Sequence, residues 1–571
     1  MLETDVSDAG VLRDWERRVR LARSELRWPA APESVITHLT GTSLALGAPT
    51  DQLFAATEVN EWALAASIAE RDPARAPSLI AALAAEQPEE TDLPTLDEAS
   101  ALLRLRRRAA REANPRLRAL LDAAAARRLP VLADEDFLTL GTGSGGHSWP
   151  AGDLPDIDTV AWDTLHGIPT ALVTGTNGKT TVVRLLAACS RAAGRVTGYC
   201  CTDGVFVAGH PLGTGDYSGP AGARRVLRDT RVEAAVLETA RGGILRRGLA
   251  VARADVAVIT SIAADHFGEF GVHDLEALTD VKLAVARALD TEGLLVVNAE
   301  DRLLVQKAPA RGKPLGWFAH DADHPLLAAH RRAGGATAGV RADRLVLARH
   351  GAEHDLGAID AMPLAAGGHS SFNVSNLATA ALGAAGLGIE PETIAAVFAR
   401  FGADPSDNTG RLMRYELGGL NLIVDFAHNP TALAGLVDFA QRLRSGGRLA
   451  LLLGQAGNRE DTDIDRLAAV AAAARPDFIV VKELASYLRG RGSGEVPAIL
   501  RGALARAGVA EGSIADAGDE DDAVHKALAW ARPGDVLVMP LHSKDGRSHA
   551  LALIEKLRRE GWSAGRPLPG T

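Results

Sequence analysis

Length, composition and charge place the chain among ordinary globular proteins. Its 571 residues exceed what one hydrophobic core usually organises, so about three domains are expected, and 47% hydrophobic with 23% charged residues excludes a disordered, collagen-like or membrane-embedded chain. The 72 acidic against 62 basic residues give a net charge of -10, which offers no general attraction for nucleic acid or an anionic membrane, so neither is expected as a partner.

The N-terminal part of the chain, residues 1–165, is rich in Ala, Leu and Arg at helical spacing and has few β-branched runs. This pattern predicts a mainly helical domain, whose role the sequence does not reveal. Its clearest helix is 99–113, which Pro115 must break. Glycine, proline and aspartate then concentrate at 141–158, which we interpret as the first linker.

From Ile168 onward, short apolar segments alternate with helical ones, which indicates parallel strands covered by helices. The predicted fold class is α/β, with two α/β domains after the helical one. The predicted strands are 170–174, 234–237, 256–260 and 294–298 in a central domain (166–408), and 420–425, 449–453, 478–482 and 536–540 in a C-terminal domain (409–571).

The sharpest motif, Gly-Thr-Asn-Gly-Lys-Thr-Thr at 175–181, lies between a predicted strand and a predicted helix, 182–193. Glycines let backbone N–H groups converge on phosphate oxygens, and the helix N-terminus adds positive potential. A lysine here reaches the β- and γ-phosphates, and the next threonine ligates Mg²⁺. Val173 stands where the general pattern has glycine, so the loop is a shortened variant, and a glycine turn with a surface lysine is the alternative. The predicted ATP-binding residues are Gly175, Thr176, Asn177, Gly178, Lys179, Thr180 and Thr181.

A carboxylate follows the next predicted strand. Glu238 ends that strand and is placed to reach a Mg²⁺ ion at the phosphate loop, because hard cations prefer carboxylate oxygens. A buried carboxylate without a partner is costly, so a salt bridge to Arg241 or Arg246 is the alternative.

Several motifs together resemble the Mur ligase superfamily, whose members join carboxylates to amines with ATP. The phosphate loop is similar to that of the superfamily, and the segments 237–249, 265–268 and 488–495 are most similar to the C-terminal, Mur-like half of the cyanophycin synthetases. The resemblance runs from about 166 to 540. It implies a P-loop central domain with a parallel sheet, followed by a second α/β domain.

The resemblance also implies a second metal site. By this resemblance, His266 corresponds to a histidine that helps to bind a second Mg²⁺ in the family. Taken alone, a histidine is more often structural. Lys282, in a predicted helix 275–289, aligns with a lysine that is carbamylated in many Mur ligases. Arginine cannot undergo this modification. Only eight of the 62 basic residues are lysine, which favours this role, with a helix-surface lysine as the alternative. The predicted catalytic residues are Lys179, Glu238, His266 and Lys282, and the predicted metal ligands are Thr180, Glu238, His266 and Lys282.

An asparagine pair, Asn373 and Asn376, resembles the pair that lies near the adenine in the family, and an amide suits a base edge because it both donates and accepts. The alternative, not exclusive of the first, is an N-cap from Ser375 or Asn376 for a helix predicted at 377–387.

Arg411 and Asp425 resemble a phosphate-binding arginine and a ribose-binding or nucleotide-orienting aspartate of the family's C-terminal domain. Surface ion pairing and a proline turn are the alternative. The family often has asparagine at the position of Ser261 and tyrosine at that of Phe426. Neither departure removes a phosphate- or metal-binding group.

A basic run at 104–108, with Arg111, Arg116 and Arg118, allows binding to a polyanion. A solvated helix face is the favoured interpretation, since no aromatic residues interleave to stack bases.

The three cysteines have neither disulfide nor metal-site spacing, which indicates a reducing compartment. The N-terminus is acidic, and no apolar run of about 18 residues occurs, so we expect the cytoplasm.

The leading functional hypothesis is an ATP- and Mg²⁺-dependent amide ligase. The family resemblance suggests that it joins arginine or another amino acid to an aspartyl side chain of a carboxylate-bearing peptide or polymer. The ATP-grasp module of the cyanophycin synthetases has no counterpart here, so a separate ATP-grasp ligase is one expected partner. A non-catalytic Mur-fold scaffold and a P-loop NTPase switch are the alternatives, and a homo-oligomer stays open.

Overall fold

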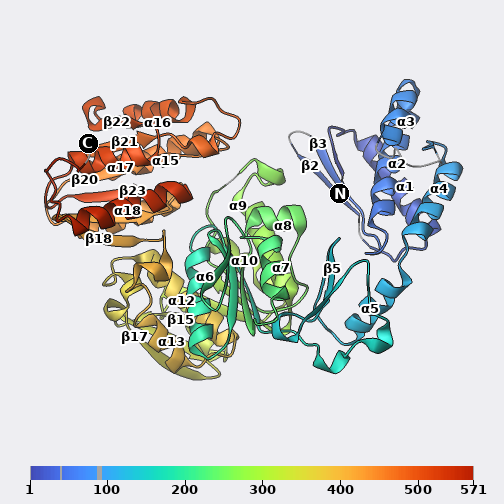
Figure 1. Cartoon of the computed structure of the whole chain (residues 1–571), viewed down its shortest axis with the longest axis horizontal. Coiled ribbons are helices and arrows are strands. Elements are labelled where there is room, and N and C mark those ends of the chain that lie inside the picture. The colour runs from blue at the N-terminus through green and yellow to red at the C-terminus, as the bar shows by residue number, and fades with distance from the viewer. Residues whose placement is uncertain (1, 32, 39–40, 86–92, 266, 570–571) are drawn as a thin grey trace. The chain divides into compact units, whose positions relative to one another are not determined.

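The computed structural model describes every residue except 1, 32, 39–40, 86–92, 266 and 570–571 (Figure 1). The chain divides into two compact units. The first comprises Met1–Leu140, Ser148–His166 and Phe267–His273, and the second comprises Gly141–His147, Gly167–His266 and Asp274–Thr571. Within the described part of the chain, none of the helices combines the length and apolar character that crossing a bilayer requires.

The first unit is built on three helices, α1 (Ala9–Glu25), α2 (Leu53–Arg71) and α4 (Glu98–Glu112), whose apolar faces form one core around Trp15 and Trp62. The prediction of helices in this region is confirmed, including the break that Pro115 imposes, because Pro115 is the first residue of α5 (Pro115–Ala126). Two small sheets accompany the helices, and we did not predict them. Their strands are β1 (Leu2–Thr4), β2 (Ser34–His38) and β3 (Gly41–Ala45), in the order β1-β3-β2, and β4 (Val131–Ala133), β5 (Phe137–Leu140) and β6 (His147–Pro150), in the order β4-β5-β6.

The basic run of α4 is not a wholly solvated face, and binding of a polyanion stays a prediction. Arg104 is buried, and its guanidinium lies 3.0 Å from the buried Glu58 of α2. Arg108 pairs with the other oxygen of the same carboxylate at 2.8 Å. The exposed Arg106 pairs with Glu25. The arginines therefore bind α4 to its neighbours.

Glu58→Gln is expected to lower the free energy of unfolding of the first unit by about 3 kcal/mol, because it leaves buried Arg104 without its counter-charge. Urea-dependent hydrogen exchange of the α2 and α4 peptides measures this loss. Arg106→Met, which breaks an exposed pair, is the matched control and should cost less than about 1 kcal/mol. Equal effects of the two variants would contradict the prediction.

The second unit begins with one large sheet. Among the described residues, eleven strands join in the order β10-β9-β8-β11-β7-β12-β13-β14-β15-β16-β17. Seven neighbouring strands of this sheet, β8, β11, β7, β12, β13, β14 and β15, run parallel. An antiparallel strand flanks them on each side, β9 beside β8 and β16 beside β15. The bounds are β7 (Thr170–Thr174), β8 (Thr197–Cys201), β9 (Gly204–Val207), β10 (His210–Thr214), β11 (Ala234–Glu238), β12 (Ala254–Ile259), β13 (Leu289–Asn298), β14 (Leu315–Asp321), β15 (Ala336–Arg341), β16 (Arg344–Arg349) and β17 (Ala352–Ala358).

Two helices, α6 (Lys179–Ala192) and α12 (Ser371–Gly386), pack against each other and against this sheet. Their apolar side chains, with those of β7, β11 and β12, form the largest core cluster described. All three cysteines lie in this part of the chain as buried free thiols. The predicted α/β class is confirmed here.

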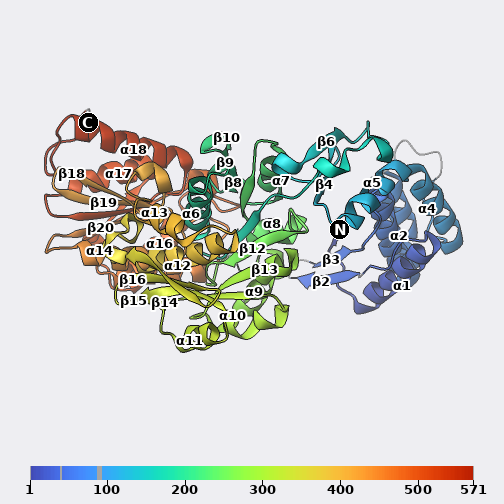
Figure 2. The same ribbon diagram turned by 90° about the horizontal axis from the view of Figure 1, so that it is seen from below.

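A second sheet follows, with strands in the order β18-β19-β23-β20-β21-β22 (Figure 2). All its neighbours pair in parallel except β18 with β19. The four strands predicted for this region have the predicted bounds, since each is an apolar run closed by polar or turn residues. The bounds are β18 (Met413–Leu417), β19 (Leu420–Asp425), β20 (Leu449–Leu453), β21 (Phe478–Lys482), β22 (Ile514–Ala517) and β23 (Val536–Pro540). The domain boundaries at 165/166 and 408/409 stay predictions.

Candidate functional site

The phosphate loop connects the end of β7 to α6, which begins at Lys179, three residues before the predicted start. Gly175 and Gly178 adopt φ values of +142° and +87°. A Cβ at Gly175 would lie 1.9 Å from Thr260 Oγ1, and one at Gly178 would lie 2.2 Å from Asn376 Oδ1. Only glycine fits either position, for both backbone and space.

The segment after β12 holds the loop in place. Ser261 accepts a hydrogen bond from the backbone N–H of Asn177 at its hydroxyl (3.0 Å) and one from that of Thr176 at its carbonyl (2.8 Å). The hydroxyl of Thr176 donates to the Ala263 carbonyl at 3.1 Å. Serine at position 261, where the family often has asparagine, thus supports the loop directly.

The hydroxyl of the loop threonine, Thr180, bonds to the carboxylate of Glu238 at the end of β11. Thr180 Oγ1 donates to Glu238 Oε2 at 2.8 Å, and Thr202 Oγ1 donates to Glu238 Oε1 at 3.1 Å. Glu238 is almost fully buried, and these hydroxyls satisfy both its oxygens, so its burial does not depend on a salt bridge. A hydroxyl beside a carboxylate fits the oxygen preference of Mg²⁺. Lys179 Nζ donates to the Thr176 carbonyl at 3.0 Å.

The second predicted metal site is only partly described, because His266 lies outside the described residues. Asp265, beside it, lies 3.0 Å from Arg459 Nη2 and 3.5 Å from His428 Nε2. Among the described residues, no group of three or more His, Cys, Asp or Glu side chains is arranged to hold a metal ion. The metal ligands therefore stay predictions.

Lys282 is not a surface residue, so the helix-surface alternative is wrong. Its side chain is 3% exposed near the end of α9 (Leu275–Leu283), which is shorter than predicted and passes into a 3₁₀ turn, Ala284–Ala288. Burial holds the pKa of its amine well below the usual lysine value, and the nearby positive charge of Lys179 lowers that pKa further. This environment favours a neutral amine, which carbamylation requires.

Neither Ser375 nor Asn376 caps a helix, so the N-cap alternative is wrong. The helix that carries them, α12, begins at Ser371 after the N-cap Ser370, and the side chains of Asn373 and Asn376 are buried. Asn376 Nδ2 donates to Asn373 Oδ1 at 3.0 Å, and Asn373 Nδ2 donates to the Leu364 carbonyl at 3.1 Å. The pair thus connects Gly178 of the phosphate loop to the segment of Leu364.

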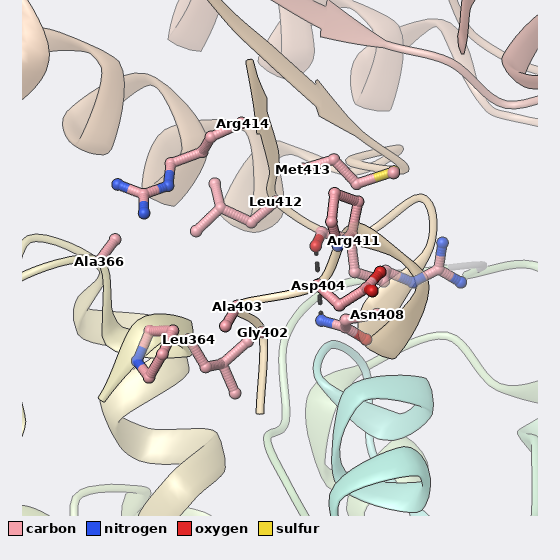
Figure 3. A pocket seen from close by; sticks show the side chains of 12 residues that line it. Leu364, Ala366, Gly402, Ala403, Asp404, Asn408, Arg411, Leu412, Met413 and Arg414 are labelled. Atoms are coloured by element: carbon pink, nitrogen blue, oxygen red, sulfur yellow. Dashed lines mark hydrogen bonds between the residues drawn. The ribbon is translucent and has the colours of Figure 1, made fainter. Parts of the chain in front are cut away.

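That segment lines a cavity of about 120 Å³ within the second unit (Figure 3). Asn408, also in its wall, donates to the hydroxyl of Thr181 at 3.3 Å, which places the cavity next to the first turn of α6. The lining residues are Pro363, Leu364, Ala366, Gly402, Ala403, Asp404, Pro405, Asn408, Arg411, Leu412, Met413 and Arg414.

Arg411 and Asp425 have different surroundings. Arg411 Nη2 lies 3.4 Å from Thr180 Oγ1, and its guanidinium lies 4.6 Å from the centre of the Phe426 ring. Asp425 accepts backbone hydrogen bonds from Leu412 and Ala427, each at 2.7 Å, and burial raises its pKa. Arg411 therefore faces the phosphate loop, whereas Asp425 holds the backbone that carries Arg411.

The phosphate loop also contacts the C-terminal sheet region. Asn429 Nδ2 donates to Asn177 Oδ1 at 2.9 Å, and the reverse amide contact is 3.3 Å. Three residues of the site lie outside the motifs and were not predicted: Asn408, and Asp203 with Arg547, which bond to each other at 3.0 Å. The position of Asp203 two residues after a buried strand was its only signal, and nothing in the local sequence pointed to Arg547.

Lys282→Met is expected to raise the free energy of unfolding by about 1 kcal/mol, because it replaces a buried amine with an apolar chain of similar length. Thermal unfolding by calorimetry measures the change. Lys307→Met is the control, since Lys307 forms a half-exposed ion pair with Asp280 at 2.6 Å and its loss should not stabilise the protein. A lower melting temperature for Lys282→Met would contradict the expected cost of the buried amine.

Comparison with known proteins agrees with the resemblance. The family profile described as the Mur ligase middle domain matches residues 173–384, and the one described as the Mur ligase, glutamate ligase domain matches residues 410–540. A UDP-N-acetylmuramoyl-L-alanyl-D-glutamate--2,6-diaminopimelate ligase of Xanthomonas campestris pv. campestris is 30% identical over 393 residues, which cover 66% of this chain and 74% of that protein.

Cyanophycin synthetase of Trichormus variabilis is 34% identical over 393 residues, or 69% of this chain. The chain spans 43% of the length of that relative. A solved structure of Escherichia coli FolC in complex with DHPP and ADP aligns with a TM-score of 0.49 at 20% identity, over 68% of this chain and 89% of that one.

Proposed function

The chain belongs to the Mur ligase family, and from that premise we propose that it is an ATP-dependent amide ligase, which activates a carboxylate as an acyl phosphate and joins it to an amine. The observation that carries the proposal is the hydrogen bond between Thr180, which follows the phosphate loop, and Glu238. Thr180, in the first turn of α6, donates to Glu238 at the carboxyl end of the adjacent strand, 2.8 Å away. A hydroxyl and a carboxylate at this place are what a nucleotide site with Mg²⁺ needs.

The reaction requires the loop to hold the phosphates while two other substrates meet. The substrate carboxylate attacks the γ-phosphate and releases ADP, and the amine then attacks the acyl carbon and expels phosphate. Lys179 exchanges its Thr176 carbonyl contact for phosphate oxygens, and Arg411 lies at the Thr180 hydroxyl, within reach of the same phosphates. These cations stabilise the charge on the transferred phosphoryl group.

Mg²⁺, when bound by Thr180 and Glu238 with the predicted ligands His266 and Lys282, supplies further charge neutralisation at the phosphates. Lys282 would serve as a ligand after carbamylation. Its neutral amine adds CO₂, forms an N–C bond and loses one proton, which turns the buried amine into a carboxylate-like group. The burial of this amine supports that step.

We place the adenine end of ATP at the mouth of the cavity beside Thr181. Its walls include small and apolar residues such as Ala403 and Leu412 together with the Asn408 amide. The Asn376 amide donates to Asn373, and the Asn373 amide donates to the Leu364 carbonyl. We therefore assign them the support of the cavity wall rather than direct contact with the base.

The finer substrate assignment follows the similarity to cyanophycin synthetase. We propose that an amino acid such as arginine is joined to the side-chain carboxylate of an aspartyl peptide or polymer. Because the match spans less than half of that relative, a separate ATP-grasp ligase is the proposed source of the aspartyl backbone.

Lys179→Ala and Glu238→Ala are each expected to lower amine-dependent ADP release by at least about 10³-fold, because each removes charge stabilisation or metal binding at the phosphates. A coupled assay for ADP measures the rate. Lys556→Ala, at an exposed position late in α18 (Lys544–Arg559), is the control and should match the wild type. Near-normal turnover in either site variant would remove the assignment.

The substrates are identified by incubating the protein with MgATP, aspartate-rich peptides and single amino acids while ADP and product mass are followed together. A ligase yields a peptide heavier by one amino acid less water, in step with ADP. ADP release that needs no carboxylate and no amine would instead support an NTPase.

A further inference from the structure

The turn between β8 and β9 carries a carboxylate that two arginines neutralise. Asp203 Oδ2 accepts from Arg184 Nη2 at 2.9 Å, and Asp203 Oδ1 accepts from Arg547 Nη2 at 3.0 Å. Arg184 is fixed in addition by the Thr409 carbonyl, 2.9 Å from its Nη1. Each oxygen of Asp203 is therefore occupied by a different guanidinium, one from α6 and one from α18.

A third arginine lies within reach of the same carboxylate. Arg411 Nη2 is 4.0 Å from Asp203 Oδ2, yet the same nitrogen is 3.4 Å from Thr180 Oγ1. The Arg411 side chain is 15% exposed and that of Asp203 is 17% exposed, so water screens their attraction only weakly. Arg411 thus lies between a carboxylate that attracts it and the loop where the phosphates of ATP would bind.

Arg547 and Arg411 also share one aromatic ring. Their guanidiniums lie 5.3 Å and 4.6 Å from the centre of the Phe426 ring. Gly410, just before Arg411, has a φ of +73°, and a Cβ there would lie 3.2 Å from Arg547 Cδ. Arg547 therefore runs directly beside the backbone that carries Arg411.

We propose that Arg547 is a positioning residue of the nucleotide site: by neutralising Asp203, it prevents this carboxylate from capturing Arg411 and keeps Arg411 directed at Thr180 and the phosphates. The inference rests on the proposed function, since it assumes that ATP binds at the loop. It assigns Arg547 no contact with ATP. Without Arg547, Asp203 Oδ1 loses its partner, and the carboxylate, still paired with Arg184 at Oδ2, attracts the next cation within reach, which is Arg411.

This arrangement predicts that a second substitution, Asp203→Asn, restores the nucleotide affinity that Arg547→Met loses. A variant that only loses structure would not recover in this way. Arg547→Met should weaken the binding of magnesium adenylyl imidodiphosphate about tenfold, the effect of losing one charge-assisted contact. Asp203→Asn alone should bind at least as tightly as the wild type. The double variant Asp203→Asn/Arg547→Met should recover to within about threefold of the wild type, because the carboxylate that captures Arg411 is gone.

Isothermal titration calorimetry with this non-hydrolysable analogue measures all four proteins and needs no knowledge of the acceptor or the amine. Arg547→Lys keeps the charge and should stay close to the wild type. Arg448→Met is the matched control, since Arg448 likewise pairs with a buried aspartate, Asp535 (2.6 Å), and stacks on an aromatic ring, Trp530 (3.8 Å). It directly precedes β20, however, and so lies at the amino end of the parallel strands, whereas Asp425 lies at their carboxyl end. Arg448→Met should leave the affinity unchanged.

A double variant that binds as weakly as Arg547→Met overturns the proposal, because Arg547 would then act on the nucleotide itself or on the fold. So does a single variant Arg547→Met with wild-type affinity. Failure of the wild type to bind the analogue overturns the proposed function and this inference together, whereas a binding wild type with additive variants overturns this inference alone. Should Arg547→Met not fold, Arg547→Gln with and without Asp203→Asn gives the same comparison.

Discussion

The close approach of the phosphate loop to its neighbours is the constraint on which the rest of the second unit depends. Gly175 and Gly178 have no Cβ, so Thr260 on one side and Asn376 on the other come within contact of the loop backbone. Each neighbour begins a chain of polar contacts. Thr260 leads into the segment of Ser261 that holds the loop, and Asn376 leads through Asn373 to the wall of the cavity.

A second set of contacts joins this loop to the C-terminal sheet. The amides of Asn177 and Asn429 bond to each other, and Arg411 reaches the hydroxyl of Thr180. Arg411 precedes β18, and Asn429 follows β19. Asp425 holds the backbone near both of them, because it accepts hydrogen bonds from the N–H groups of Leu412 and Ala427. The site is therefore shared by two sheets, and its geometry depends on how their loops pack.

Charge balance explains why so many arginines gather around so few acids. Asp203 accepts from two guanidiniums and lies near a third, and Glu58 in the first unit likewise pairs with two. A buried carboxylate is stable only with counter-charges or donors, and the planar guanidinium supplies several donors in a fixed geometry. Arginine thus organises both units, whereas the buried Lys282 carries the amine that the proposed carbamylation needs.

Local sequence predicted eight strands of the second unit and the phosphate loop, because apolar runs and glycines act through neighbours close in the chain. The contact between Thr180 and Glu238, 58 residues apart, also needs the pairing of β7 with β11. Local sequence also placed Pro115 at a helix start. Tertiary structure alone decided the rest. The helix of Asn373 and Asn376 begins at Ser371, before the pair, and the amide of Asn376 bonds to that of Asn373 inside the helix. Asp203 and Arg547 are 344 residues apart in the sequence and meet only when β8 and α18 are brought together, so no local pattern could announce them. Packing over such distances fixes which charges meet, and that choice is a property of the fold.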